Sequence, residues 1–483
     1  MLSFFLSSKK IENNIYIPKY YDPTINNEFN KLKRHYNLIK IKDLIIQNKI
    51  KVSTGHEIGK MAYGTGTIPF VRTSDISNWE IKTIPKQGVS ENIYNEYKLK
   101  QDVKEGDIFL VRDGTYLIGT NCFITNLDEK ILFQSHILKF RILDKNINPI
   151  LFFIALNSKI VQRQIRNKQF TADIIDTIGD RFSEILLPIS KSTVKNNKIT
   201  KLVSKGLENR NKLKKIIRYF PYKIEKILIT NEFNKSENSI NKKDEDINQD
   251  TLSAEMYDFN SYWIKSNNIK KSIYIPKYYD PSIINELKIL EKNNKILSFL
   301  ELKKKGLIDY QTGDEIGKMA YGTGSIPFVR TSDFTNWEIK HDPKQGISEE
   351  IYQNYKNKQN VKENDIFLVR DGTYLVGSSA MVTSSDEKSL FCGGLYKINI
   401  KKNNIIDPWL FFGLLNTYIV KKQMRAKQFT RDVIDTLGHR VDEVLIPIPK
   451  NEEVKKYIKE LVFNTITERI NIRNTINNIS KII

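Results

Sequence analysis

An internal duplication constrains this chain more than any other feature of its sequence. The nine residues IYIPKYYDP occur twice, and three longer or shorter segments return at nearly the same spacing. A repeat of this length is far too long for a solenoid unit, so the sequence predicts two copies of one whole domain. The matching pairs are residues 15–23 and 273–281, 54–82 and 312–340, 107–116 and 365–374, and 168–171 and 427–430.

Each copy mixes strand and helix patterns, which predicts a mixed α/β fold of the α+β class. Residues 68–72 and 107–114 are short apolar runs that end in turn residues, as strands do. Residues 151–166 carry aromatic and aliphatic side chains at helical spacing and then become basic, and residues 410–425 repeat this pattern. Residues 185–188 and 444–447 are predicted to form a last strand that a proline stops.

A basic amphipathic stretch follows each copy. The first covers residues 195–220, and Pro221 is expected to halt it. The second has apolar side chains in steps of three and four, close to a heptad seam. This stripe suits a partner helix, although a surface helix packed on its own domain gives a similar pattern. The seam positions are Val454, Ile458, Leu461, Thr465, Glu468, Ile472, Ile476, Ile479 and Ile483.

These patterns predict five parts along the chain. Residues 231–250 are polar, with six acidic residues against three lysines, and are expected to form a flexible linker. The predicted parts are a first domain at 1–190, a spacer helix at 191–230, a linker at 231–258, a second domain at 259–449 and a C-terminal helix at 450–483.

The charge balance indicates an acidic partner. Seventy-seven Lys and Arg face 56 Asp and Glu, for a formal charge of +21, and nucleic acid is the first candidate. A lysine-rich composition is also what an AT-rich genome would encode. No apolar run is long enough for a membrane span, and the two cysteines form no C-x-x-C motif, so we expect a cytoplasmic, nucleoid-associated protein.

Arginines recur at matching places in the two copies. Arg can hold phosphate or read guanine with two hydrogen bonds, which favours DNA contact. Scaffold ion pairs are the alternative, for example Arg72 with Asp75 or Arg112 with Asp113. The matched pairs are Arg72 and Arg330, Arg112 and Arg370, Arg166 and Arg425, and Arg181 and Arg440.

Three segments resemble the motifs of a target recognition domain, the DNA-reading module in specificity subunits of type I restriction–modification systems. They are residues 64–75, 106–114 and 175–188, and the second copy matches at 322–333, 365–372 and 434–447. The order of the parts, with a helix after each domain, is also similar. The chain departs from the family in its short spacer helix and long polar linker.

The resemblance implies a non-catalytic subunit without cofactor or metal. Each domain would read one half of a bipartite site in double-stranded DNA, and the two helices would pair as an antiparallel coiled coil that fixes the distance between the domains. The subunit would dock two copies of a DNA adenine-N6 methyltransferase subunit and, through them, a restriction/translocase subunit.

Polar residues beside the predicted strand ends and in the recurring segments are the candidate DNA contacts, because loops there can enter a groove. In the first copy they are Lys60, Tyr63, Thr65, Arg72, Ser74, Arg112, Thr115, Lys168, Gln169 and Thr171. In the second copy they are Lys318, Tyr321, Thr323, Arg330, Ser332, Arg370, Thr373, Lys427, Gln428 and Thr430.

Positions that differ between the copies are candidates for base reading, or for neutral drift after duplication. The near-identity of the copies otherwise predicts a gapped, roughly palindromic target. The differing pairs are His56 and Asp314, Ile76-Ser77 and Phe334-Thr335, Thr83-Ile84 and His341-Asp342, and Gln134-Ser-His136 and Cys392-Gly-Gly394.

Two other functions stay open from the residues alone. Asp75 with Glu80-Ile-Lys82, repeated as Asp333 with Glu338-Ile-Lys340, resembles the Asp…Glu-x-Lys metal site of Mg²⁺-dependent nucleases. The second of these functions is that of a stand-alone sequence-specific DNA-binding protein without a methyltransferase partner. Neither a methyltransferase signature nor an ATP-binding loop is present.

Overall fold

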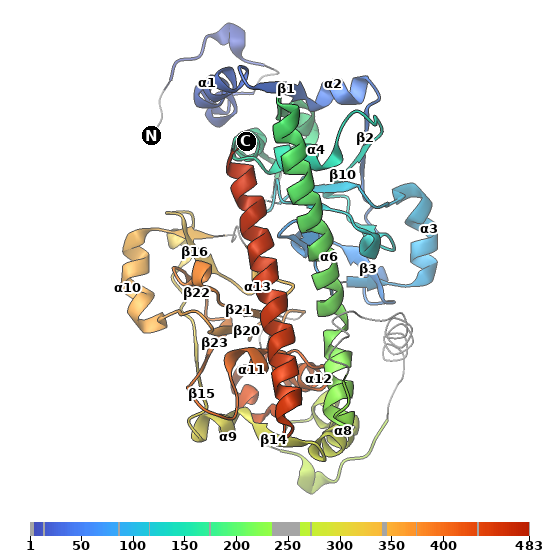
Figure 1. The fold of residues 1–483 in the computed structure, drawn as a ribbon, viewed down its shortest axis with the longest axis vertical. Coiled ribbons are helices and arrows are strands. Elements are labelled where there is room, and N and C mark those ends of the chain that lie inside the picture. The colour runs from blue at the N-terminus through green and yellow to red at the C-terminus, as the bar shows by residue number, and fades with distance from the viewer. Residues whose placement is uncertain are drawn as a thin grey trace. The chain divides into compact units, whose positions relative to one another are not determined.

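Two compact units divide the chain in the computed structural model, which describes residues 4–12, 15–85, 87–114, 116–172, 175–233, 261–270, 273–340, 345–372, 374–431 and 434–482. One unit joins Met1–Lys212 to Asn471–Ile483, and the other is Leu213–Ile470. Two long helices, α6 (Thr193–Thr230) and α13 (Glu452–Ile482), each contribute to both units and are drawn in green and red in Figure 1.

The domain of the first unit is built on two small sheets. A four-stranded antiparallel sheet has the order β2 (Ile50–Thr54), β10 (Ile137–Ile142), β7 (Ile108–Val111) and β8 (Asn121–Phe123). A three-stranded sheet has the order β6 (Gln87–Val89), β3 (Ile68–Val71) and β9 (Leu132–Phe133). Strand β7 is apolar throughout and all four of its residues are buried, as expected for a strand covered on both faces. Three strand pairs complete the unit: β1 (Tyr36–Lys40) with β13 (Leu186–Ser190), β4 (Ile76–Ser77) with β5 (Glu80–Ile81), and β11 (Phe170–Ala172) with β12 (Ile175–Thr177).

Five shorter helices surround these strands: α1 (Pro23–Leu32), α2 (Ile41–Ile46), α3 (Glu91–Gln101), α4 (Pro149–Asn157) and α5 (Lys159–Lys168). The single helix predicted over residues 151–166 is therefore two helices. Ser158 separates them because its backbone is extended, with φ −65° and ψ 145°. None of the helices in the described ranges is both long and apolar enough to cross a membrane.

The second unit repeats this architecture, so the predicted duplication of a mixed helix-and-strand domain is confirmed. Its sheets have the orders β15-β23-β20-β21 and β19-β16-β22, and its pairs are β14-β26, β17-β18 and β24-β25. The strands are β14 (Asn294–Ser298), β15 (Ile308–Thr312), β16 (Ile326–Val329), β17 (Phe334–Thr335), β18 (Glu338–Ile339), β19 (Gly346–Ile347), β20 (Ile366–Val369), β21 (Ser379–Met381), β22 (Leu390–Phe391), β23 (Leu395–Ile400), β24 (Phe429–Arg431), β25 (Ile434–Thr436) and β26 (Leu445–Pro449). The helices are α8 (Pro281–Glu291), α9 (Phe299–Lys304), α10 (Glu349–Gln359), α11 (Pro408–Leu415) and α12 (Tyr418–Lys427).

Prolines interrupt the chain less than the sequence predicts. Helix α6 continues through Pro221 to Thr230, so the expected stop at that proline is wrong. Proline removes one backbone donor, but Ile224, Ile227 and Leu228 beyond it are buried in the core of the second unit, and this burial offsets the lost hydrogen bond. Pro188 likewise lies inside β13, which pairs with β1 alone among the described strands, and an edge strand tolerates proline.

The long helices pack against each other within each unit. In the second unit, Phe220 of α6 and Ile458 and Val462 of α13 belong to one buried cluster. In the first unit, a Cβ added to Gly206 of α6 would lie 3.2 Å from Cγ2 of Ile472 in α13. The end of α6 therefore meets the start of α13 in one unit, and its start meets the end of α13 in the other, which is an antiparallel pairing.

The predicted seam of α13 is largely buried. Ile483 lies outside the described residues, and every other seam position except Glu468 is buried. A second set of buried residues on α13 was not predicted, because the helix is covered both by α6 and by its own domain. This set includes Tyr457, Val462, Ile466, Arg469 and Arg473.

A tight turn between β4 and β5 directs two side chains inward. Asn78 and Trp79 both have positive φ, at 49° and 66°, as the two central residues of a mirror-image hairpin turn require. This conformation is unfavourable for a residue as large as Trp79. The indole Nε1 donates to Oδ1 of Asn157 at 3.0 Å, which helps to hold the turn. Asn336 and Trp337 repeat the geometry, with φ of 43° and 72°.

Candidate nucleic-acid interface

An exposed loop follows β2 and is held rigidly by its own hydrogen bonds. It turns at Gly59, where φ is 72°, and presents Lys60 and Met61 to solvent. Thr65 donates from Oγ1 to the carbonyl of Ala62 at 2.8 Å and accepts from the N–H of Ser90 at 3.1 Å, so its hydroxyl closes the turn. The second copy repeats the loop, with Lys318 and Met319 exposed and Thr323 bonded to Ala320 and Ser348.

Arg72 lies at the end of β3 with its guanidinium near an aromatic ring. Its Cζ is 5.9 Å from the ring centroid of Tyr63, within range of a cation–π contact. The carboxylate of Asp75 accepts from the backbone N–H of Arg72 at 3.0 Å, so it serves the turn and not the guanidinium. Arg330, Tyr321 and Asp333 repeat this arrangement, with a Cζ–centroid distance of 5.6 Å and an N–O distance of 2.9 Å.

Arg112 is committed to its own domain by an ion pair with Asp113. Its Nε and Nη2 lie 3.1 and 2.9 Å from Oδ2 of Asp113. The carboxylate also accepts from the hydroxyl of Thr177, and Nδ1 of His136 lies 2.7 Å from Oδ2. Burial alone would raise the pKa of Asp113, but the hydrogen bonds from Arg112, Thr177 and His136 hold that pKa below its ordinary value.

Lys168 is likewise held inside the domain. Its Nζ lies 2.6 Å from Oε2 of Glu184 and 4.3 Å from the ring centroid of Tyr20. The hydroxyl of Tyr20 donates to the same carboxylate oxygen at 2.7 Å. Burial and the bond to Glu184 raise the pKa of Tyr20. The second copy repeats the contacts with Lys427, Glu443 and Tyr278.

Gln169 and Thr171 brace the β11–β12 hairpin. Both donate to the carboxylate of Asp176, from Nε2 at 3.2 Å and from Oγ1 at 2.6 Å. In the second copy, Gln428 and Thr430 make the same bonds to Asp435, at 3.2 and 2.5 Å. These four polar groups therefore have partners within their own domains.

The loops of one copy form a continuous surface. A Cβ on Gly55 would lie 2.1 Å from the carbonyl oxygen of Phe133, so the Lys60 loop lies directly against the loop that carries His136. The hydroxyl of Ser135 donates to the carboxylate of Glu57, and the N–H of Arg112 donates to the carbonyl of His136 at 2.9 Å.

The candidate residues thus separate into two groups. The bonded group consists of Thr65, Arg112, Lys168, Gln169 and Thr171 with Thr323, Arg370, Lys427, Gln428 and Thr430. Among the described residues, the side chains of Lys60, Ser74, Lys318 and Ser332 have no hydrogen-bonding or ionic partner, and the guanidiniums of Arg72 and Arg330 have only the tyrosine rings. Thr115 and Thr373 lie outside the described residues.

Some of the positions that differ between the copies are unsuited to base reading. Ile76, Ser77, Phe334 and Thr335 are at most 5% exposed, so their differences adjust the core. Nδ1 of His56 lies 3.2 Å from Nε2 of Gln101. Thr83 and Ile84 correspond to residues 341 and 342 of the second copy, which lie outside the described residues.

Sequence reasoning missed two features of this surface. The side chains of Met61 and Met319 are 93% and 92% exposed, although each sits on a loop fixed by hydrogen bonds. Their signal in the sequence was the unchanged KMAYGTG segment in both copies. The second feature is the buried ion pair between Glu80 and Arg210, which lie 130 residues apart in the chain.

The nuclease reading of Glu80 and Glu338 is wrong, because both carboxylates are buried ion-pair partners. Oε1 of Glu80 lies 3.1 Å from Nη2 of Arg210 in α6, and Oε2 of Glu338 lies 2.7 Å from Nη2 of Arg469 in α13. Asp75 and Asp333, the other proposed ligands, are 1% and 0% exposed. A catalytic metal needs an open coordination position, which these buried groups do not offer.

Comparison with known proteins gives likeness at the level of fold only. No family model and no curated protein matches the sequence. The chain is similar to the S subunit of a type I restriction-modification system from M. genitalium, with 12% identity, a TM-score of 0.33 and 92% of each chain covered. It is also similar to the HsdS subunit from Thermoanaerobacter tengcongensis (11% identity, TM-score 0.26, 92% of this chain and 95% of that chain). A chain from a structure of the type I R-M system gives 11% identity and a TM-score of 0.26, over 92% of this chain and 96% of that chain.

Proposed function

We propose that this chain is a non-catalytic DNA-specificity subunit of a type I restriction–modification complex. The observation that carries the proposal is a loop surface built twice in one chain, in which Lys60 and Arg72, and their counterparts Lys318 and Arg330, have cationic groups that no described carboxylate neutralises. A cationic group without a neutralising carboxylate is available to bind a phosphate or a base edge.

The two kinds of basic residue have different proposed roles. The exposed lysines neutralise phosphates and fix the position of the domain on the duplex. Arg72 and Arg330 lie over tyrosine rings, which limits their freedom and suits them to bidentate contact with guanine in the major groove. The bonded residues, such as Gln169 and Lys168, shape the loops and contact DNA only if their internal bonds exchange.

The long helices are proposed to separate the two recognition domains. Each domain reads one half of a bipartite site, and the paired helices α6 and α13 set the gap between the halves. The recurring segments of the two domains are nearly identical, so the target is a gapped and roughly palindromic sequence. Two copies of an adenine-N6 methyltransferase subunit bind this subunit and recruit a restriction/translocase subunit.

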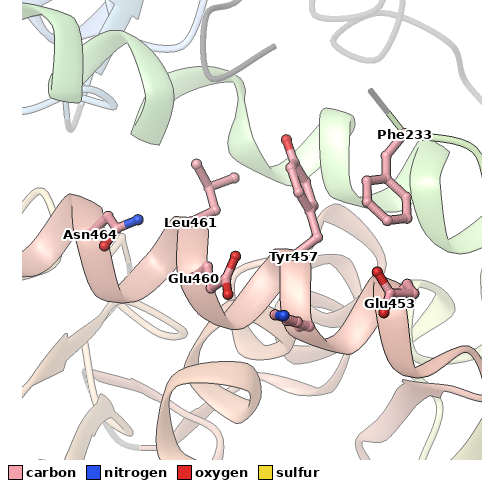
Figure 2. A pocket seen from close by; sticks show the side chains of 7 residues that line it. Phe233, Glu453, Tyr457, Glu460, Leu461 and Asn464 are labelled. Atoms are coloured by element: carbon pink, nitrogen blue, oxygen red, sulfur yellow. The ribbon is translucent and has the colours of Figure 1, made fainter. Parts of the chain in front are cut away.

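A pocket of about 220 Å³ beside the first turns of α13 is unsuited to DNA. Figure 2 shows Tyr457 and Leu461 pointing from α13 towards the neighbouring helix, with the ring of Phe233 beside Tyr457. The two rings lie 4.8 Å apart. Glu453 and Glu460 line the pocket together with one lysine, Lys456, so its lining carries more acidic than basic side chains and does not favour phosphate.

Methylome sequencing of a host that carries the full system tests the proposal. We expect one bipartite adenine-methylated motif that disappears when this chain is deleted. A methylation pattern that does not depend on the chain would overturn the type I assignment. A pull-down that recovers the chain bound to specific DNA, but never with a methyltransferase, would instead favour a stand-alone DNA-binding protein.

A further inference from the structure

One carboxylate is enclosed in the first copy and open in the second. Asp113 and Asp371 occupy equivalent positions in the repeated segment FLVRDGT, and each follows an arginine at the end of a central strand. Their side chains nevertheless differ in exposure, at 6% for Asp113 and 27% for Asp371. The residue responsible is His136, which the second copy replaces with Gly394.

In the first copy both carboxylate oxygens are occupied. Oδ1 of Asp113 accepts from the hydroxyl of Thr177 and from Nε of Arg112, at 3.2 Å for the latter. Oδ2 accepts from Nη2 of Arg112 at 2.9 Å, and the imidazole of His136 lies over it with Nδ1 at 2.7 Å. The ring is 34% exposed and therefore forms the outer face of this cluster.

In the second copy Oδ1 of the carboxylate takes the hydrogen bond from Thr436 and the contact with Arg370. Oδ1 of Asp371 accepts from Oγ1 of Thr436 at 2.5 Å and lies 3.1 Å from Nε of Arg370. Nη1 of Arg370 turns away and donates to the carbonyl of Gly393 at 3.2 Å. Among the described residues, none donates a hydrogen bond to Oδ2 of Asp371.

We propose that Oδ2 of Asp371 accepts a hydrogen bond from the exocyclic amino group of a cytosine or adenine, and that His136 denies the first domain the same contact. The inference rests on the proposed DNA-reading function and adds a base preference that differs between the two domains. Cytosine N4 and adenine N6 are the amino donors that the major groove displays, and carboxylates accept from them. The two half-sites of the roughly palindromic target then differ at this position.

The exchange of His136 and Gly394 between copies is sterically feasible. A Cβ on Gly394 would lie 2.8 Å from Cγ2 of Thr331 and 3.6 Å from Cβ of Asp371. The closer contact is a side-chain methyl group and not backbone, so Thr331 must shift to admit the Cβ. Gly394 has no positive φ, so its backbone accepts a side chain.

Binding-site selection from a randomised bipartite DNA library tests the inference. Wild-type chain should select an amino-bearing base, by about tenfold, at one position of the second half-site only. H136G should create the same preference at the mirrored position of the first half-site. G394H, or the triple exchange C392Q/G393S/G394H, should remove it from the second half-site, and D371N should relax it.

H136N is the control for a change in loop structure caused by the glycine in H136G. Its amide can still donate to Asp113, so it should keep the carboxylate covered and leave the first half-site unchanged. T335S is the control at a buried position that differs between the copies and should alter neither half-site. Specific binding with unchanged bases in H136G and G394H would overturn this inference alone, whereas absence of any specific DNA binding by wild-type chain would overturn the proposed function itself.

Discussion

Arg469 in α13 and Glu338 in β18 form an ion pair from which solvent is wholly excluded. Nη2 and Nε of the arginine lie 2.7 and 3.0 Å from Oε2 of the glutamate, and neither side chain is exposed. The first unit contains the equivalent pair, between Arg210 of α6 and Glu80 of β5. A buried charge pair therefore joins each domain to the helix that follows it in the chain.

Removing one partner of this pair should be far more damaging than removing both. E338Q removes the carboxylate that pairs with the buried Arg469 guanidinium, which costs about 3–5 kcal/mol, whereas an apolar replacement of both partners is often nearly neutral. Chemical denaturation of E338Q and of E338L/R469M measures the contrast. Equal losses in the two variants would show that packing, and not charge, holds the helix. E80Q with E80L/R210M repeats the experiment in the first unit.

Close packing at Gly413 should not tolerate a methyl group. A Cβ there would lie 2.7 Å from Cγ2 of Ile458 and 3.1 Å from Cγ2 of Val462. We expect G413A to lower the free energy of unfolding by about 1–3 kcal/mol, as overpacking does. The combined F220A/G413A variant should lose less than the sum of the single changes, since the Phe220 ring also borders this site at 3.4 Å.

Gly206 is the matched control for that experiment. A Cβ there approaches only the Cγ2 of Ile472, at 3.2 Å, and glycine is intrinsically poor in a helix. G206A should therefore be neutral or stabilise the protein by up to about 1 kcal/mol. A destabilised G206A together with a tolerated G413A would contradict the packing described for α13.

Lys60 and Lys318 should contribute to the salt dependence of DNA binding. Each phosphate neutralised changes the slope of log affinity against log salt by about 0.9. The K60A/K318A variant should have a slope smaller by about 2, with its sequence preference retained. K130A is the control, because Lys130 is also exposed but pairs with Glu91 at 3.0 Å. A slope equal to wild type in K60A/K318A would remove these lysines from the interface.

Stability should fall in acid through Glu184 and Glu443. Burial opposes ionisation, yet bonds from the lysine and tyrosine partners hold the pKa of each carboxyl below its ordinary value. A lowered pKa in the folded state means that the stabilisation is complete above the unfolded pKa of about 4.3 and is lost as pH falls through the lower folded pKa. Melting temperatures of wild type and E184Q/E443Q from pH 3 to pH 7 test this. The variant should be less stable at pH 7 and show a weaker decline in acid.

The purified chain should not cleave DNA with Mg²⁺, because Glu80 and Glu338 are committed to arginines. Incubation of plasmid DNA with the chain and Mg²⁺, followed by electrophoresis, is the measurement. Cleavage that E80A/E338A abolishes, in protein shown by circular dichroism to be folded, would restore the nuclease function.

Much of the architecture could be predicted because its signals are local or repeated. The duplication follows directly from matching segments, and the buried stripe of α13 follows from steps of three and four residues at positions such as Ile458 and Ile472. The expected proline stop failed because burial of residues far away in the sequence outweighed a local preference. The break at Ser158 was missed because apolar side chains lie on both sides of it.

Two copies of one α+β domain, each followed by a long basic helix, can be recognised from the amino-acid sequence alone. Which of the repeated polar residues already have partners within their own domain is seen only in the folded structure. In the sequence, Arg112 and Lys168 are basic residues of recurring segments, as Lys60 and Arg72 are. In the structure, however, Arg112 is bound to Asp113 and Lys168 to Glu184. The cause is that a hydrogen bond or an ion pair depends on distance in space and not on separation along the chain. Glu80 meets Arg210 across 130 residues of chain, and no local pattern records such a contact.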